Sequence, residues 1–371
     1  MVHFIPKRLE IARKSRGMTQ KQLVEDSHLP RQSISKYESG KSTPEMTHII
    51  SIANVLGYPI SFFSKPITEE NSSSPFFRKK ASVTQSRYEK QSIRIRFVKE
   101  IYDDIGNYVY FPDINLPLLN EKDIEYITDE DIMNMAHSIR NRWNLGESPI
   151  EYLIPTIESN GIVISNSTIK DEQLDAVSQW IGDVPIILLS DNNESEYCRR
   201  FNIAHELGHL VLHSFIPNVL ELTTNDYNKM EKQANLFASH FLMPRDCFMD
   251  SIRSTELDYL LYFKKYWKVS LQAIIYYIHG LGLMSENQYM YLQKKMSKNG
   301  WRKVEPYDKE SNREDPELLH KAYNMLIKNN IFTEKSFLNY TSLPEKEVIK
   351  MLNIKTKEKR PSLKLLYKSA N

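Results

Sequence analysis

Hydrophobic residues along positions 5–65 recur with the spacing of short helices, and turn residues separate the runs. Residues 66–75 are polar and Ser-rich and are bounded by prolines, as in a linker. Residues 76–105 look helical and basic, and helical spacing returns at 129–144. In the first third of the chain, the pattern therefore predicts helices and a linker, and no β-strand.

The pattern changes after this point. Residues 161–165 (GIVIS) and 185–190 (PIILLS) are short apolar runs bounded by turn residues, which predict β-strands. Helical spacing follows over residues 195–214, 227–243 and 270–280. We therefore expect a multidomain chain. Its predicted parts are an all-α head (1–65), a linker and basic helix (66–125), an α+β domain (126–300) and a helical C-terminal region (301–371).

Composition adds an expectation about the compartment. The 371 residues exceed what one small core needs, and the chain contains only two cysteines, Cys198 and Cys247. Two thiols make no disulfide framework, which favours a reducing environment. The N-terminus lacks the apolar region of a secretory signal, and the most apolar stretch, 271–283, is too short for a bilayer. We expect a cytoplasmic protein without a membrane partner.

Charge is unevenly distributed, although the formal net charge is only +2. Residues 7–44 contain nine Lys/Arg against four Asp/Glu, and residues 76–100 contain eight against two. Both stretches could face DNA phosphate. For the second stretch, a positively charged helix between domains is an equally good interpretation.

Residues 16–44 (RGMTQKQLVEDSHLPRQSISKYESGKSTP) predict two helices around a tight turn. Thr19 and Gln22 have the spacing of a capping box, and Gly40 suits the left-handed position after a helix. Ile34 and Tyr37 should face the core. The residues between them should point outward, with side chains able to reach base edges and phosphates: Arg31, Gln32, Ser33, Ser35 and Lys36.

This segment resembles the phage-repressor-like helix-turn-helix family (XRE, Cro/C1-type) over about residues 5–65. The resemblance implies a five-helix domain that binds a double-stranded DNA operator, with Arg31 to Tyr37 as the recognition helix. It also implies that Gln20 contacts phosphate and that Arg13 and Glu38 form a structural ion pair. Pro30 departs from the family, in which Ser or Thr usually caps this helix. A homodimer is expected, because paired half-sites suit such a head.

Residues 198–213 (CRRFNIAHELGHLVLH) contain the motif His205-Glu206-x-x-His209. Residues four apart lie on one face of a helix, so the two imidazoles can bind one ion. A zinc peptidase needs three protein ligands and one open position. The motif alone occurs by chance in ordinary chains, and the third ligand has to come from elsewhere.

His213 extends the same stripe, but its Cα lies roughly 12 Å from that of His205 along the axis, too far for one ion. We predict His213 to be structural, and His240 and His279 as well, because a single histidine in a helix is more often a structural residue than a ligand. Glu231 is the better third ligand, because it opens a second amphipathic helix, EKQANLFASHFLMP. Asn235, one turn later, is placed to steady a ligand from behind.

The two motifs HELGH and ExxANxFAxxFLMP together resemble the ImmA/IrrE metallopeptidase family over about residues 126–250. The resemblance implies a zincin-like (gluzincin) domain with Zn²⁺ on His205, His209 and Glu231, and Glu206 as the catalytic carboxylate. The fusion to a helix-turn-helix head also resembles an arrangement known in that family. Its members act in phage induction, mobile-element control and stress responses by cutting a repressor.

Two functions remain open from the sequence. The first is a DNA-binding regulatory zinc metalloprotease whose substrate is a repressor or another regulator. The alternative is a DNA-binding repressor or antitoxin whose metal domain senses without turnover. A second open point concerns residues 185–190, which predict either an edge strand that receives a peptide substrate or a plain core strand.

Overall fold

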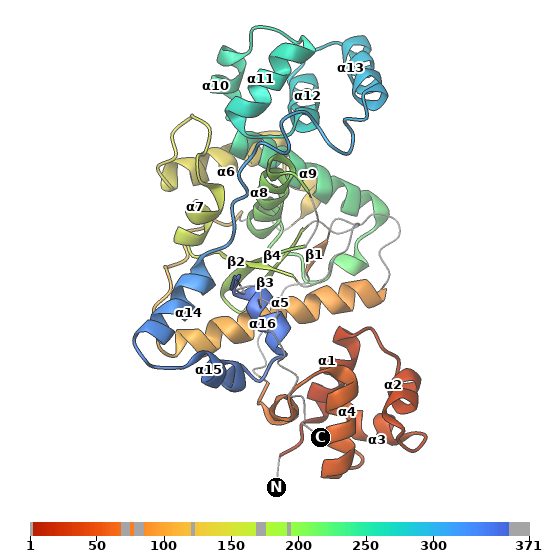
Figure 1. Cartoon of the computed structure of the whole chain (residues 1–371). Coiled ribbons are helices and arrows are strands. Elements are labelled where there is room, and N and C mark those ends of the chain that lie inside the picture. Colours follow the sequence, from red (N-terminus) through yellow and green to blue (C-terminus); the bar gives the residue numbers. More distant parts are fainter. Residues whose placement is uncertain are drawn as a thin grey trace, which may run out of the picture.

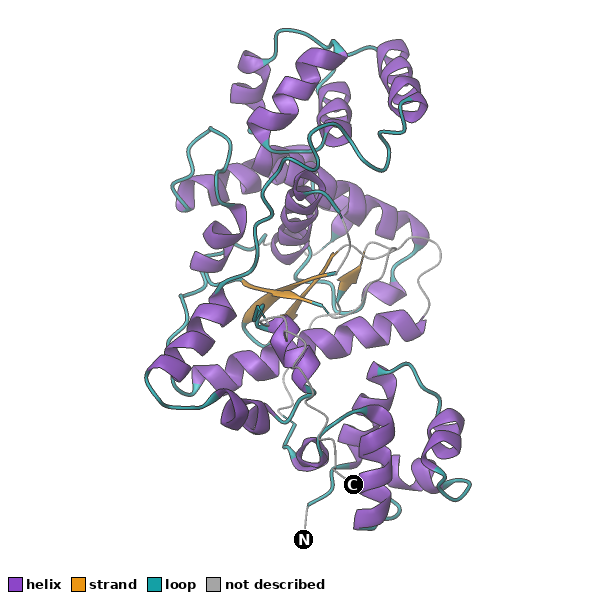
Figure 2. Cartoon of the chain, viewed as in Figure 1, coloured by secondary structure: helices purple, strands orange, loops and turns teal. Residues whose placement is uncertain are grey.

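The computed structural model describes residues 3–67, 75–77, 85–119, 123–167, 176–190 and 194–355. A helical head lies at one end, a small sheet between helical layers in the middle, and a second group of helices at the other end (Figures 1 and 2). Both family-derived expectations, an all-α head and an α+β body, are confirmed.

The head consists of α1 (Pro6–Ser15), α2 (Gln20–Ser27), α3 (Ser33–Glu38), α4 (Met46–Leu56) and the 3-10 turn η1 (Ile60–Ser64). The capping box at the start of α2 is present, since the Thr19 hydroxyl accepts from Gln22 N–H and the Gln22 side chain accepts from Thr19 N–H. Ile34 and Tyr37 are buried, and Gly40 has φ +70°. These sequence predictions are confirmed.

The recognition helix starts later than expected. Gln32 adopts φ +72°, so α3 begins at Ser33 and Arg31 lies in the preceding turn. Ser33 is buried and its hydroxyl donates to the carbonyl of Pro30. The expectation that Ser33 points outward is therefore wrong. The residue before α3 is therefore Gln32 rather than Pro30, and its side chain makes no capping hydrogen bond.

The sheet has four strands in the order β1-β3-β4-β2, with bounds β1 (Phe76–Phe77), β2 (Val163–Asn166), β3 (Ala176–Ile181) and β4 (Val184–Leu189). β2 and β4 are parallel and the other pairs are antiparallel. β4 lies between β3 and β2, so the edge-strand interpretation of residues 185–190 is wrong. Helices cover both faces of β4, which explains its continuous apolar run.

One face of the sheet packs against α8 (Glu196–Leu212), behind which lie α9 (Thr224–Leu242) and α6 (Asp129–Arg142). The other face packs against α5 (Gln85–Gly106), with α14 (Leu318–Lys328) and α16 (Glu345–Met351) beside it (Figure 1). Alternating residues of β4 pack into two different cores, one on the α8 face of the sheet and one on the α5 face. Ile187 and Leu189 join the first core, and Ile186 and Leu188 join the second.

α5 connects the head to the sheet. Residues 76–77, expected to be helical, form a strand instead, and the helix begins at Gln85. Its basic residues Arg94 and Lys99 are buried, and Lys99 pairs with Asp103 at 2.8 Å. Glu100 accepts from Arg8 of the head at 2.7 Å. These contacts favour the inter-domain helix over phosphate binding.

The remaining helices either lie beyond α9 or belong to the segments that connect the layers and lead back towards the head. Their bounds are η2 (Ile124–Tyr126), α7 (Leu153–Ser159), η3 (Val219–Glu221), α10 (Arg245–Ser251), α11 (Leu257–Trp267), α12 (Leu271–Gly280), α13 (Glu286–Lys298) and α15 (Glu334–Thr341). The basic end of the chain, residues 356–371, and most of the predicted linker, 68–74, lie outside the described residues. Within the described ranges, no helix combines the length and apolar composition needed to cross a bilayer.

Candidate metal centre

Two neighbouring helices, α8 and α9, carry the predicted ligands. α8 is capped by the Ser195 hydroxyl, and its apolar stripe of Ile203, Leu207 and Leu210 is fully buried. Gly208 allows α9 to approach closely, because a Cβ at this position would lie 2.9 Å from the Phe237 ring and 3.3 Å from the Ala234 carbonyl. The close approach brings Glu231 of α9 to the two histidines of α8.

His205, His209 and Glu231 form a compact donor set, with one ligand atom from each lying within 4.8 Å of the others. The two Nε2 atoms are 3.0 Å apart, His209 Nε2 is 3.4 Å from Glu231 Oε1, and His205 Nε2 is 3.6 Å from Glu231 Oε2. Ligands of a tetrahedral zinc ion are spaced by roughly 3.3 Å. The residues present therefore fit a zinc ion.

His205 is oriented by α9. Its Nδ1 lies 3.0 Å from Asn235 Oδ1, an atom that can only accept. The Nδ1–H therefore donates to the amide, and the lone pair of His205 stays on Nε2. This is the tautomer that a metal ligand needs, and it matches the supporting position predicted for Asn235.

His209 is oriented by a longer chain of hydrogen bonds. Gln233 donates its amide N–H groups to the carbonyls of Ile124 and Ile127, at 3.0 and 3.2 Å, which fixes its Oε1 as an acceptor. His213 Nε2 must then donate to that Oε1, 3.1 Å away. Burial, followed by the neighbouring His209, holds the pKa of His213 well below its usual value, so this imidazole is neutral. Its Nδ1 accepts from His209 Nδ1–H at 3.1 Å, which leaves the His209 lone pair on Nε2.

The carboxylates are held as well. Glu206 is buried, and its Oε2 accepts from the Ser178 hydroxyl of β3 at 2.6 Å. The Tyr227 hydroxyl donates to Glu231 Oε1 at 3.0 Å, from one turn earlier on α9. The three predicted ligands thus lie together, and the side chain of Glu206, the next residue after His205, is held against the sheet.

Several supporting residues were not predicted. His213 lies outside the donor set, as predicted, but its hydrogen bond to His209 was not predicted, although a spacing of four residues places the two on one helix face. Tyr227 has the same relation to Glu231. Ser178 comes from a strand distant in sequence, and no local pattern indicates it.

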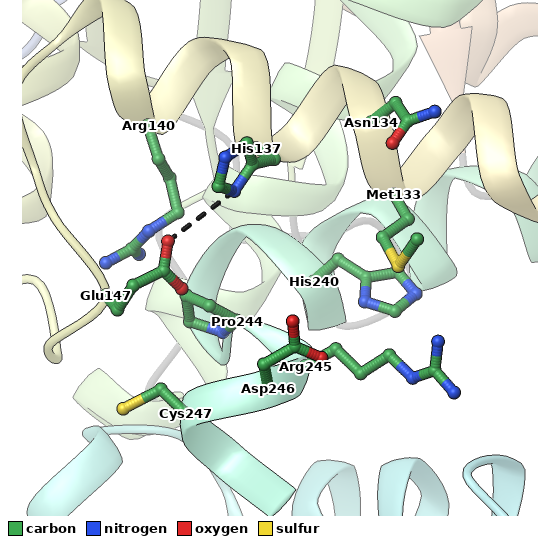
Figure 3. Close-up of a pocket in the computed structure, with 10 residues that line it drawn as sticks. All are labelled: Met133, Asn134, His137, Arg140, Glu147, His240, Pro244, Arg245, Asp246 and Cys247. Carbon is green, nitrogen blue, oxygen red and sulfur yellow. Dashed lines mark ion pairs between the residues drawn. The ribbon is translucent and has the colours of Figure 1, made fainter.

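A separate cavity of about 520 Å³ lies between α6, the end of α9 and the start of α10 (Figure 3). His137 and Glu147 form an ion pair at its wall, 3.5 Å apart. His240 lines it with Nδ1 3.0 Å from the Tyr277 hydroxyl, and burial lowers the pKa of this histidine to about 4. None of the proposed metal ligands is among its lining residues.

The head presents its own polar face. Arg31, Gln32, Ser35 and Lys36 are exposed, and Gln20 lies exposed at the first position of α2. Arg13 binds both oxygens of Glu38, at 2.6 and 2.9 Å, and Gln20 donates to the same carboxylate at 2.6 Å. This bidentate pair joins α1 to α3.

Comparison with protein families gives two matches. A helix-turn-helix model matches residues 9–63, and a peptidase M78 model, described as the IrrE N-terminal-like domain, matches residues 157–279. The predicted fusion is therefore confirmed, and the second match contains the whole donor set. Comparison with curated proteins finds no match.

Proposed function

We propose that this chain, in which a helix-turn-helix domain is joined to an M78-type peptidase domain, is a regulatory zinc metalloendopeptidase. Its substrate is a repressor or another regulator in phage, mobile-element or stress responses. The head binds a double-stranded DNA operator through Arg31, Gln32, Ser35 and Lys36, with Gln20 at phosphate.

The arrangement around the donor set carries this proposal. His205, His209 and Glu231 would hold zinc. Both imidazoles have their lone pair on Nε2, and these two nitrogens lie within 3.6 Å of the Glu231 carboxylate oxygens, so the three donors converge. A zinc ion in such a site polarises a scissile carbonyl and makes water more acidic. The donors come from two helices packed around Gly208, so the site is rigid before any substrate arrives.

Glu206 is the proton carrier in this proposal. Ser178 donates to one carboxylate oxygen, which orients the group. The carboxylate accepts the proton of the attacking water and returns it to the leaving amine. Asn235 and His213 act through the histidines and are positioning residues.

A pair of glutamate variants separates metal binding from chemistry. Glu231→Ala should lose zinc, because two imidazoles alone make a weak site, and Glu206→Gln should keep it. Zinc content of the purified full chain measures both. Full zinc occupancy in Glu231→Ala would reject the third ligand.

The cellular experiment compares new protein N-termini in cells that express wild type or Glu206→Gln, with and without DNA damage. Termini that depend on Glu206 would identify both the activity and the substrate. If none appear although purified wild type contains zinc, the proposed turnover is wrong. The chain would then be a metal-binding DNA regulator.

A further inference from the structure

The two-residue strand β1 occupies the outer edge of β3 at the metal centre. It pairs antiparallel, with Phe76 opposite Ser178 and Phe77 opposite Val177. Ser178 is the residue that binds Glu206. Residues directly opposite in such a pair point to the same face of the sheet, so Phe76 shares the α8 face with the proposed catalytic carboxylate.

The Phe76 side chain lies against one of the proposed ligands. Its ring is parallel to the His209 imidazole, with centroids 5.2 Å apart and an interplanar angle of 1°, and it is 0% exposed. The His213 ring also lies beside it, with centroids 6.3 Å apart, and the other neighbours are mainly hydrophobic. They are buried residues from η2, η3, α9 and the loop after α8: Ile124, Ile216, Val219, Tyr227 and Met230.

A peptide substrate needs the same place. An extended peptide binds an exposed strand edge through main-chain hydrogen bonds, and pockets beside that edge select its side chains. Of the four strands described, β3 is the one that runs beside Glu206, and β4 covers its other edge. The outer edge of β3 is therefore the peptide-accepting edge of this site.

We propose that the outer edge of β3 binds substrate, that the pocket around Phe76 accepts an aromatic side chain of it, and that Phe76–Phe77 fills both as a tethered competitor. This inference rests on the proposed function. A segment of the same chain competes at an effective concentration on the order of millimolar. A free peptide must displace it, so the apparent affinity of the peptide equals its intrinsic affinity multiplied by the fraction of time that the edge is free.

The test measures peptide binding, which does not require turnover. The protein is the zinc-loaded full chain carrying Glu206→Gln, with and without Phe76→Ser. The probe is a fluorescein-labelled peptide that copies residues 72–79 (SSSPFFRK), and a second peptide has alanine in place of its first phenylalanine. Fluorescence anisotropy gives the Kd of each.

We expect Phe76→Ser to lower the Kd of the phenylalanine peptide about tenfold, with a smaller change for the alanine peptide. Phe76→Leu, which keeps an apolar side chain, should give an intermediate Kd and preserve folding if serine does not. Phe337→Ser is the matched control, since Phe337 of α15 is also 0% exposed but belongs to a different hydrophobic cluster.

Unchanged or weaker peptide binding in both Phe76 variants, with zinc retained, would overturn the inference. β1 would then only protect a sheet edge. Tighter binding in Phe337→Ser as well would also overturn it, because general loosening would explain the effect. Absence of cleavage in cells, by contrast, would leave the binding result standing and reject only the proposed turnover.

Discussion

At the scale of single residues, the metal centre depends on hydrogen bonds behind its ligands. Each of the two histidine ligands donates its Nδ1–H to a fixed acceptor. The acceptor is Asn235 for His205 and neutral His213 for His209. These bonds determine which nitrogen carries the lone pair. Zinc affinity should therefore depend on residues that never touch the ion.

Replacing His213 tests this dependence. His213→Ala removes the acceptor of His209 Nδ1–H, so the ring can rotate or change tautomer, and zinc affinity should fall about 10- to 100-fold. Competition with a chelator of known affinity measures the change. His240→Ala is the control, because that buried histidine also bonds a side chain, the hydroxyl of Tyr277, but has no link to the donor set. Equal affinity in the two variants would contradict the role of His213.

At the scale of elements, the site depends on how closely α8 and α9 approach. Gly208→Ala would place a methyl group 2.9 Å from the rigid Phe237 ring, so the helices must separate. We expect a loss of about 1–3 kcal/mol in the free energy of unfolding and weaker zinc binding. Urea denaturation and metal titration measure both effects.

Gly280→Ala is the matched control for Gly208→Ala. Gly280 ends α12, and a Cβ there meets nothing within 4 Å. Alanine should leave stability unchanged or raise it by up to about 1 kcal/mol, as it favours the helix. If Gly208→Ala behaves like this control, the close approach of the helices is not limiting.

The donor set could be predicted because its information is local. His205 and His209 share a helix face at a spacing of four, and Glu231 is an acidic residue of the neighbouring amphipathic helix. The expectation that Glu231 opens that helix is wrong, because α9 begins at Thr224. The capping role of Thr19 and the left-handed conformation of Gly40 were also predicted correctly from the local sequence. Local information failed where distant segments meet. Phe76 looked helical among basic neighbours, yet it pairs with β3, and β4 was read as a possible edge although β3 and β2 flank it.

At the scale of the whole molecule, the head and the body share one apolar core. The cluster extends from Leu9 and Phe62 of the head through Phe97 of α5 to Ile186 of β4, and it includes Val348 of α16. A polar contact closes the same junction, where Arg16 of α1 pairs with the buried Glu347 of α16. The C-terminal region thus contacts the head directly through α16.

Breaking this pair should loosen the head. Glu347→Ala leaves the Arg16 guanidinium without its carboxylate, which should cost about 1–2 kcal/mol because Arg16 is partly solvated. Hydrogen exchange should accelerate in both α1 and α16. Glu345→Ala, which removes an exposed carboxylate from the same helix, should leave both rates unchanged. Faster exchange in α16 alone would show that the two helices are not coupled.

The shared core also limits how such a protein can be recombined with others. Phe62 of the head packs edge-to-face on Phe97 of α5, with centroids 5.9 Å apart and planes at 90°. A foreign head joined at residue 65 would leave Phe97 facing an unmatched surface, and Arg8 could no longer reach Glu100. The segment that can be exchanged between regulators is therefore the head together with α5, although the family match of the head ends at residue 63.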